Sequence, residues 1–336
     1  MSTDPNPVRL AIIGAGGIAK AHASAATELS LPITAVADLN AESGARLAGE
    51  HGARSFTTSD ELFAARDAGK AEFDAVVLCT PPTVRLDPIR AALERGVAVL
   101  AEKPLAANAD EAGRIAELAA AHPDTLFAVA YCHRFAPAIV EMKRLVAGGR
   151  IGRLTRFENC FAFFHPPKGE SWMSDPALSG GGSFIDTGCH SLDIFRDMVG
   201  PAELVGAVYD HEWPGRAESS ATALVRATSG EHAGVGGVIL AGWMEPTRFT
   251  VTLVGTGGTL HYDYMNAEVI RHTASDDTVN ELPIETHEVR FREQLRAFAA
   301  GVNDPTARGS LATAEDGLGT AEVVEHAGQV TAGKII

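Results

Sequence analysis

The chain has 336 residues, of which 46% are hydrophobic and 21% charged, the composition of a globular protein large enough for two cores. Its formal net charge of -15 disfavours contact with nucleic acid or an anionic membrane surface, so we expect neither partner. We expect no signal peptide in Met1–Pro7, and the longest apolar run, Ala233–Met244, is too short to span a bilayer. The four scattered cysteines favour a reduced, cytoplasmic protein without a disulfide framework or a structural zinc.

Short apolar runs alternate with helical stretches in the first part of the chain. The runs expected to form strands are Val8–Ile13, Ile33–Ala37, Ala75–Leu78, Val97–Ala101 and Phe127–Ala130. The expected helices are Gly17–Leu29, Ala41–His51, one starting at Ser59-Asp60-Glu61, Pro88–Arg95, and one running from Asn108 to His122. This alternation predicts a parallel sheet covered by helices on both faces.

The pattern changes near Gly148. The strands expected after this point are Leu154–Phe164, Leu204–His211, Ala221–Thr228, Val235–Gly242, Phe249–Val254 and Thr259–Asp263, with a hairpin loop at Gly255-Thr256-Gly257-Gly258. The expected helices are Phe184–Val199, Phe291–Ala300 and Ala314–Ala327. We therefore predict an α/β protein with a doubly wound parallel sheet in residues 1–150, and an α+β domain with a large, mostly antiparallel open sheet in residues 151–336.

A glycine-rich turn links the first predicted strand to the first predicted helix. Its residues, Gly14-Ala15-Gly16-Gly17-Ile18-Ala19, fit the pattern G-x-G-x-x-A. In this pattern the first glycine permits a tight turn and the second lets a pyrophosphate approach the backbone. Because the helix amino terminus offers free N–H groups, we predict a dinucleotide site that includes Gly14, Ala15, Gly16, Gly17 and Ile18. The alternative is a purely structural turn.

Asp38 follows the second predicted strand, at the offset expected of an acid that binds the adenosine ribose. Its carboxylate would accept hydrogen bonds from the ribose hydroxyls and would repel a 2′-phosphate. The sequence therefore favours NAD as the cofactor and leaves NADP possible. The alternative is a surface acid at the end of a strand.

Two further loops follow predicted strands of the same sheet, at the edge where doubly wound sheets bind ligands. They are Cys79-Thr80-Pro81-Pro82 and Glu102-Lys103-Pro104, and we expect cofactor contacts from Thr80, Pro81, Glu102 and Lys103. A lysine at the mouth of an apolar sheet is poorly solvated and can stabilise a developing oxyanion. The alternatives are prolines that only punctuate a loop and a Lys103 that pairs with Glu102 on the surface.

The segment from Gly180 to Asp193 is the most specific stretch of the second half. Three glycines permit close backbone approach, and Asp186 and His190 are spaced i, i+4, so that an α-helix would place both on one face. Asp193 follows His190 by three residues. A histidine beside a carboxylate is suited to act as a general base near neutral pH, although a lone helical histidine is more often structural.

Four segments occur in a familiar order. They are Gly14–Ala19, the triplet Glu102-Lys103-Pro104, the run Tyr131-x-x-Arg134-Phe135-x-Pro137, and Gly180–His190. Together they resemble the glucose–fructose oxidoreductase, inositol dehydrogenase and MocA (Gfo/Idh/MocA) family over nearly the whole chain. The resemblance implies an amino-terminal Rossmann domain, and a carboxy-terminal domain whose large sheet commonly forms dimers or tetramers.

The resemblance also carries residue roles. It implies that Lys103, Asp186 and His190 form the catalytic set, that Tyr131 lies near the nicotinamide and the substrate, and that the Lys103–Pro104 peptide bond is cis. Two positions depart from the family: Arg85 stands where many members have a histidine, and Trp172-Met173 where many have Trp-Arg.

The sequence thus predicts an NAD(P)-dependent oxidoreductase that moves a hydride between nicotinamide and a secondary hydroxyl or ketone of a sugar, cyclitol or related polyol. The residues expected to contact this substrate are Tyr131, Trp172, Asp186 and His190. We expect a homodimer or homotetramer assembled through the carboxy-terminal sheet. We expect no metal, because the other histidines considered, His133, His211 and His261, lack partner acids at ligand spacing. Two alternatives are a glycoside-cleaving enzyme that oxidises its substrate transiently with NAD, and a sugar- or nucleotide-sensing regulator without catalysis.

Overall fold

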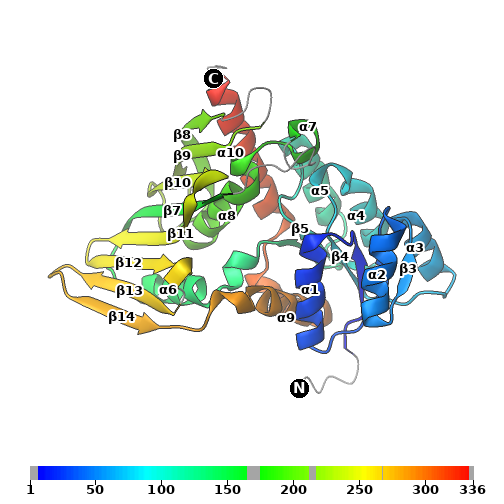
Figure 1. Ribbon diagram of the computed structural model, residues 1–336. Helices are drawn as coiled ribbons and strands as arrows, with labels where there is room; N and C mark the ends of the chain where they lie inside the picture. Colours follow the sequence, from blue (N-terminus) through cyan, green and yellow to red (C-terminus); the bar gives the residue numbers. More distant parts are fainter. Residues whose placement is uncertain (1–6, 165–174, 212–216, 267, 333–336) are drawn as a thin grey trace. The chain divides into compact units, whose positions relative to one another are not determined.

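The computed structural model describes residues 7–164, 175–211, 217–266 and 268–332 (Figure 1). The chain divides into two compact units, which are described separately. Unit 1 comprises Met1–Ala106, Asp110–Tyr131 and Phe291–Gly317, and unit 2 comprises Ala107–Ala109, Cys132–Arg290 and Leu318–Ile336. In the part of the chain that the structure describes, no helix combines the length and apolar character needed to cross a membrane.

Unit 1 is built on a six-stranded parallel sheet with the order β3-β2-β1-β4-β5-β6. Its strands are β1 (Leu10–Ile13), β2 (Ile33–Ala37), β3 (Arg54–Phe56), β4 (Ala75–Leu78), β5 (Ala98–Glu102) and β6 (Phe127–Ala130). The strand order reverses between β1 and β4, which is the doubly wound arrangement of a Rossmann fold. The carboxyl ends of β1, β4 and β5 therefore lie beside one another.

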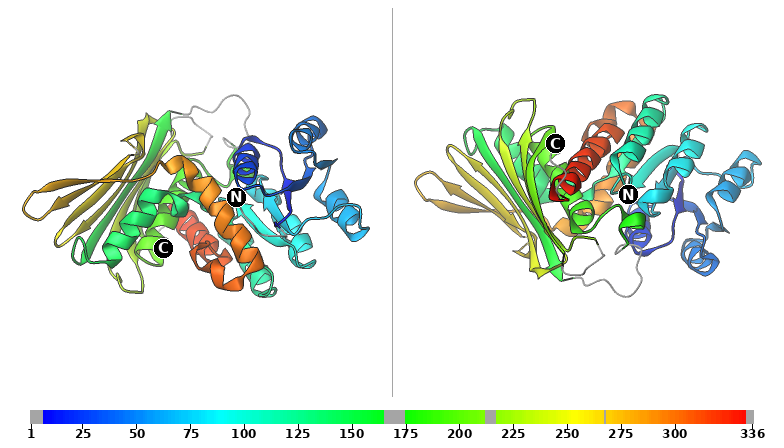
Figure 2. Two further views of the ribbon diagram at one scale, coloured as in Figure 1. Left: turned by 90° about the horizontal axis from the view of Figure 1, so that it is seen from below. Right: turned by 90° about the horizontal axis from the view of Figure 1, so that it is seen from above.

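Unit 1 has helices that connect these strands and lie on the sheet (Figure 2), and two later helical elements belong to the same unit. They are α1 (Gly17–Glu28), α2 (Ala41–His51), α3 (Ser59–Asp67), the 3₁₀ turn η1 (Pro82–Val84), α4 (Leu86–Leu93), α5 (Ala109–Ala120), α9 (Arg290–Asn303) and the 3₁₀ turn η7 (Pro305–Ser310). Local chemistry sets several ends. Asn40 caps α2 by accepting from Ser43 N–H at 3.0 Å, and α2 stops at Gly52, which adopts a left-handed φ of 65°. Thr58 caps α3, one residue before the predicted Ser59.

Unit 2 contains an eight-stranded sheet with the order β14-β13-β12-β11-β7-β10-β9-β8. Its strands are β7 (Leu154–Phe164), β8 (Ala202–Asp210), β9 (Ser220–Ala227), β10 (Gly236–Gly242), β11 (Met244–Gly255), β12 (Gly258–Asp263), β13 (Val269–Ala274) and β14 (Val279–Pro283). Strands β7 and β10 are parallel, and the other neighbouring pairs are antiparallel. Gly255 pairs with Gly258, so the predicted hairpin loop joins β11 to β12.

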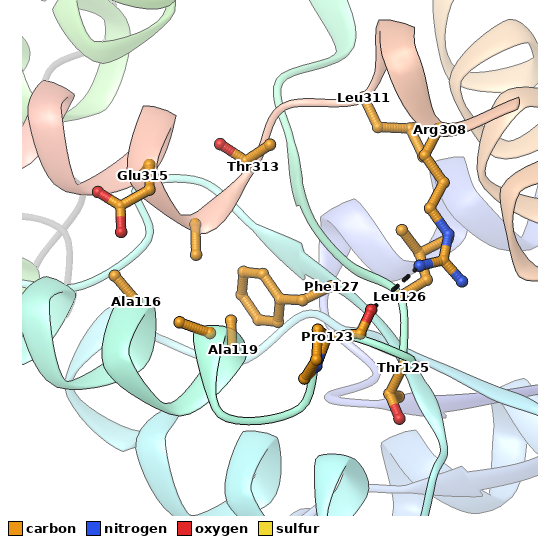
Figure 3. Close-up of a pocket in the computed structure, with 12 residues that line it drawn as sticks. Ala116, Ala119, Pro123, Thr125, Leu126, Phe127, Arg308, Leu311, Thr313 and Glu315 are labelled. Carbon is orange, nitrogen blue, oxygen red and sulfur yellow. Dashed lines mark hydrogen bonds between the residues drawn. The ribbon is translucent and has the colours of Figure 1, made fainter. Parts of the chain in front are cut away.

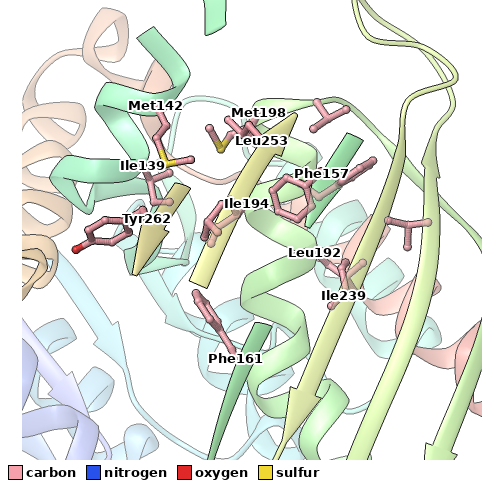
Figure 4. Close-up of a cluster of buried hydrophobic side chains, with 14 of the residues drawn as sticks. Ile139, Met142, Phe157, Phe161, Leu192, Ile194, Met198, Ile239, Leu253 and Tyr262 are labelled. Atoms are coloured by element: carbon pink, nitrogen blue, oxygen red, sulfur yellow. The ribbon is translucent and has the colours of Figure 1, made fainter. Parts of the chain in front are cut away.

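In the described part of unit 2 the helical elements are the turn η2 (Cys132–Phe135), α6 (Pro137–Ala147), α7 (Pro176–Ser179), the π-helical turn η4 (Phe184–Gly188), α8 (Cys189–Met198), η5 (Tyr264–Asn266), η6 (His287–Val289) and most of α10 (Ala314–Thr331). Residues of α6, α8 and α10 form one apolar core with the sheet, and Figure 4 shows part of it. Ile139 and Met142 of α6 and Ile194 of α8 meet Phe157 and Leu253 from the sheet there, all less than 1% exposed. The opposite face of β8 and β9 carries the exposed side chains of Val205, Val208 and Leu224.

The predicted fold class is confirmed: a parallel, doubly wound sheet precedes a larger, mostly antiparallel one. Strands β3, β13 and β14 were not predicted from the sequence. Strand β3 has two exposed residues among its three, and β14 at the sheet edge is mostly exposed, so neither shows an apolar run. The predicted helix Phe184–Val199 begins as the π-helical turn η4 and becomes α-helical only at Cys189.

Candidate functional site

The glycine-rich turn lies between β1 and α1, as predicted. Gly14 adopts a φ of 92°, and a Cβ there would lie 2.9 Å from the carbonyl carbon and oxygen of Cys79. Only glycine fits this backbone without strain. A Cβ at Gly16 or Gly17 would meet nothing within 4 Å, so the outer side of the turn is open. This open side lies at the amino terminus of α1, where a pyrophosphate can accept hydrogen bonds from backbone N–H groups.

Asp38 follows β2 and points its carboxylate at this turn. Oδ2 accepts the N–H of Ala15, and Oδ1 accepts the N–H of Asn40 at 2.7 Å. A carboxylate has about four acceptor positions, so two oxygens that each bind one N–H retain capacity for ribose hydroxyls. The turn and the acid together fit a dinucleotide.

The loops after β4 and β5 are joined by Arg85, which is 2% exposed. Its Nε and Nη2 donate to the carbonyl of Thr80 at 3.0 and 2.7 Å, and its Nη1 donates to the carbonyls of Glu102 and Pro104. The Lys103–Pro104 bond between these carbonyls is cis, as the resemblance implies. The Oγ1 atom of Thr80 is buried and has no hydrogen-bond partner among the described residues.

Glu102 is buried, and its side chain is directed into unit 1 rather than to the surface. Oε1 lies 2.7 Å from Nε2 of His22 in α1, and Oε2 accepts the backbone N–H of Lys103 at 3.0 Å. Glu102 therefore links the loop of Lys103 to the helix that begins at the glycine turn. Tyr131 follows β6 and is 1% exposed.

In unit 2 the glycine run is held by a buried acid. The carboxylate of Glu218 accepts the N–H groups of Gly182 and Phe184 at 2.8 and 2.9 Å. A Cβ at Gly182 would lie 1.9 Å from the carbonyl oxygen of Glu218, so no larger residue fits. Burial raises the pKa of the Glu218 carboxyl above its usual value, although the two N–H groups oppose this shift.

Asp186 and His190 lie in consecutive helical elements, Asp186 in η4 and His190 in the first turn of α8. Asp186 accepts a hydrogen bond at 3.0 Å from the indole Nε1 of Trp243, a buried residue that the sequence did not single out. His190 is partly buried and its Nδ1 atom is enclosed, so Nε2 is the nitrogen better placed to meet a ligand.

His133 packs against His190, with ring centroids 4.6 Å apart in an edge-on arrangement. Its Nδ1 lies 2.9 Å from the hydroxyl of Tyr264. Burial raises the pKa of Tyr264 well above its usual value, so this hydroxyl stays protonated and can donate to His133. From the sequence we expected no role for His133. In the structure it is a direct neighbour of His190, the predicted base.

Arg134 connects the turn η2, which also contains His133, to α8. Its Nε and Nη2 donate to both oxygens of Asp193 at 2.7–3.1 Å, with both side chains buried. Asp193, three residues after His190, thus binds an arginine of the Tyr131-x-x-Arg134 run. The motif residues Arg134 and Asp193 act in holding η2 against α8.

Trp172 and Met173 lie outside the described residues. A cavity of about 250 Å³ in unit 1 is lined by Phe127, Leu311, Arg308 and neighbours at the start of β6 (Figure 3). It contains none of the predicted site residues. In the described part of the chain, no three His, Cys, Asp or Glu side chains are grouped so that they could hold a metal ion.

The spatial neighbours that sequence reasoning missed share one property. His22, Glu218 and Trp243 meet their partners across 80, 34–36 and 57 positions of sequence, respectively. No local spacing marks such contacts. His133 had a signal, since it lies within the Tyr131-x-x-Arg134 run.

Comparisons with known proteins give a consistent family. Residues 8–131 match the model described as oxidoreductase family, NAD-binding Rossmann fold, and residues 139–261 match the Gfo/Idh/MocA carboxy-terminal domain. The chain is 34% identical over 193 residues to the rhizopine catabolism protein MocA of Rhizobium meliloti, covering 57% of each chain. It is 31% identical over 194 residues to inositol 2-dehydrogenase 3 of Saccharopolyspora erythraea, covering 57% of this chain and 54% of that one. The matched region thus spans little more than half the length of these curated relatives.

Solved structures show the same fold along nearly the whole chain. An inositol dehydrogenase homologue from Azotobacter vinelandii, complexed with NAD+, superposes with a TM-score of 0.89 at 20% identity, covering 99% of this chain and 97% of that one. Levoglucosan dehydrogenase, in complex with NADH and levoglucosan, gives a TM-score of 0.86 at 19% identity, covering 98% of both.

Proposed function

Because the chain belongs to the Gfo/Idh/MocA oxidoreductase family, we propose that it is a nicotinamide-dependent dehydrogenase acting on a secondary hydroxyl of a sugar, cyclitol or related polyol. The observation that carries this proposal is the pairing of the open glycine turn with Asp38, whose carboxylate already binds that turn through Ala15. Relatives named inositol 2-dehydrogenase, D-xylose 1-dehydrogenase and levoglucosan dehydrogenase support the substrate class.

Gly14–Ile18 would hold the pyrophosphate through backbone N–H groups, and Asp38 would accept the adenosine ribose hydroxyls. A carboxylate at this position repels a 2′-phosphate, so NAD is the preferred cofactor. Thr80, Pro81, Glu102 and Lys103 would border the cofactor at the carboxyl ends of β4 and β5. Bound nicotinamide supplies the exchange of a hydride with the carbinol carbon.

Side chains of the protein would carry out the proton transfer and stabilise the charge that develops. His190 takes the hydroxyl proton at Nε2, because its Nδ1 is enclosed. Lys103 stabilises the negative charge that develops on the substrate oxygen. Asp186, which the resemblance places in the catalytic set and whose carboxylate accepts the Trp243 indole N–H, would orient His190. In the reverse direction His190 acts as the acid. Tyr131 and Trp172 complete the substrate contacts proposed from the sequence.

We also propose self-association through the exposed face of the unit 2 sheet. Val205, Val208 and Leu224 are 61%, 70% and 48% exposed on neighbouring strands. Exposed apolar side chains that are grouped in this way mark interaction sites more often than scattered ones do. A homodimer or homotetramer would cover them. Light scattering of the wild type and of Val208→Glu tests this proposal, since the charge should lower the oligomer mass and a monomeric wild type would contradict it.

The deciding experiment incubates the purified protein with NAD or NADP and a panel of cyclitols, aldoses, sugar acids and anhydrosugars. Reduced cofactor is followed by absorbance. We expect it to form with at least one compound and faster with NAD. Binding of NAD without turnover on a panel of this breadth would favour a regulator. Cleavage of a glycoside without accumulating NADH would favour transient oxidation.

A further inference from the structure

Arg85 is a buried cation that joins two loops by their backbones. One loop contributes the carbonyl of Thr80, and the other contributes the carbonyls of Glu102 and Pro104, which flank Lys103 on either side. Removing a guanidinium from water is costly, so a group that is 2% exposed must recover that cost from well-formed hydrogen bonds. The hydrogen bonds described for Arg85 go to three backbone carbonyls, and two of these flank the predicted catalytic lysine.

The other side of this loop is also fixed. Lys103 donates its backbone N–H to Glu102 Oε2 at 3.0 Å, and Glu102 Oε1 contacts His22 at 2.7 Å. The backbone of Lys103 is thus held by the Glu102 carboxylate on one side and by Arg85 on the other. A shift of this backbone would therefore carry the Lys103 side chain and its ammonium group with it.

We propose that Arg85 is a positioning residue, whose guanidinium ties the Thr80 loop to the Lys103 loop and thereby sets where the Lys103 ammonium acts. The inference rests on the proposed role of Lys103 in stabilising substrate charge. Arginine suits this task because its planar fork presents donors in several fixed directions, whereas a lysine has one compact ammonium group. A lysine at position 85 retains the charge but reaches one loop at a time.

Arg308, which is partly exposed, provides a control with the same donor group. It also donates to three backbone carbonyls of unit 1, those of Gly301 at 3.0 Å, Asp124 at 3.3 Å and Pro123 at 3.5 Å. These carbonyls lie in other segments than the two loops of Arg85. Arg308→Met therefore measures what losing a carbonyl-binding arginine does to unit 1 in general.

The test compares Arg85→Lys, Arg85→Met and Arg308→Met with the wild type in kcat, KM for NAD and thermal unfolding. A displacement of about 1 Å can cost about 100-fold in rate, so we expect kcat of Arg85→Met to fall by about 10- to 100-fold. Arg85→Lys should fall less but remain below the wild type. Arg308→Met should keep the kcat of the wild type, even if its unfolding temperature falls as much as that of Arg85→Met. Unchanged kcat in the Arg85 variants, or an equal loss in Arg308→Met, overturns the inference.

A second measurement does not need turnover. Limited acetylation of the folded proteins, read by mass spectrometry, gives the reaction rate of Lys103 relative to the exposed Lys20. We expect this ratio to change severalfold in Arg85→Met and to stay at the wild-type value in Arg308→Met. The same ratio in wild type and Arg85→Met overturns the positioning role. Lack of turnover by the wild type would instead refute the proposed function, while the acetylation ratio still decides whether Arg85 positions Lys103.

Discussion

The two units hold their candidate residues by different means. In unit 1 the residues follow the ends of parallel strands and are fixed through the backbone: Gly14 by its φ, Thr80 and the Lys103 loop by Arg85. In unit 2 Asp186 and His190 lie at a helix start, and side chains hold them, namely the Trp243 indole and the His133 ring. A backbone-defined site follows from sheet topology, whereas a site defined by side-chain packing depends on contacts distant in sequence.

The largest expected effect tests whether both units contribute to one reaction. His190→Asn should lower kcat by about 10²–10⁴-fold, because general-base catalysis contributes that much. Lys103→Met should cause a loss of similar size by removing the charge that stabilises the oxyanion. Steady-state kinetics measures both, and fluorescence titration with NADH checks that the cofactor still binds. Full turnover in His190→Asn would remove unit 2 from the chemistry, and a Lys103→Met variant altered only in NADH affinity would make Lys103 a binding residue.

The next effect compares ion pairs of the two units. Arg134→Met in unit 2 should lower the free energy of unfolding by about 3–5 kcal/mol, because it leaves the buried Asp193 carboxylate without its bidentate donor. Arg9→Met in unit 1 breaks a pair with Asp74 in which both side chains are 37% exposed, and should cost about 1 kcal/mol or less. Urea denaturation gives both values. Equal losses in unfolding free energy would show that burial does not determine how much each ion pair contributes to stability.

A smaller effect concerns the cofactor. Asp38→Asn should weaken NAD binding by about 10- to 100-fold, since hydrogen bonds to a charged acceptor contribute about 1.5–3 kcal/mol. The affinity for NADP should fall less or improve, because the repulsion of a 2′-phosphate is removed. Isothermal titration with both cofactors measures the ratio. A variant that loses NAD and NADP affinity equally would show that Asp38 serves mainly to hold Ala15 and Asn40.

The smallest effect is a pH dependence in unit 2. Burial raises the pKa of Glu218, so the folded state binds this proton more tightly than the unfolded state. The stability that this protonation contributes is fully present below the unfolded carboxyl pKa of about 4.3, and is lost as pH rises through the raised folded value. Glu218→Gln does not titrate there. The unfolding free energy of the wild type minus that of Glu218→Gln should therefore fall as pH rises above about 4. A constant or rising difference would contradict this reading.

Much of unit 1 could be predicted because its signals are local. Four apolar residues at Ala75–Leu78 form a buried strand as expected, and the glycine turn has the open side that its pattern requires. Unit 2 shows where local signals end. The i, i+4 spacing of Asp186 and His190 predicts one continuous α-helix, whereas the two residues lie in separate elements, the π-helical turn η4 and helix α8.

Arg85 illustrates the same limit in unit 1. In the sequence Arg85 only differs from the histidine that many family members have at this position. Its neighbours give no sign of its three carbonyl partners, which lie 5, 17 and 19 positions away. Every residue has a backbone carbonyl, so the residue types in a sequence do not show which carbonyls accept a hydrogen bond. Asp193 likewise has a histidine at helical spacing, but its bidentate partner, Arg134, lies 59 positions earlier.

The discontinuity of unit 1 has a consequence for biosynthesis. Its last segment, Phe291–Gly317, is translated after all of Cys132–Arg290, and Ala312 then pairs with Val129 of β6. Unit 1 therefore cannot complete its contacts on the ribosome until the sheet of unit 2 has emerged. A fragment ending near residue 150 would lack α9 and the partner of Val129, so an independently folding version calls for a circular permutation or a fusion that restores this segment.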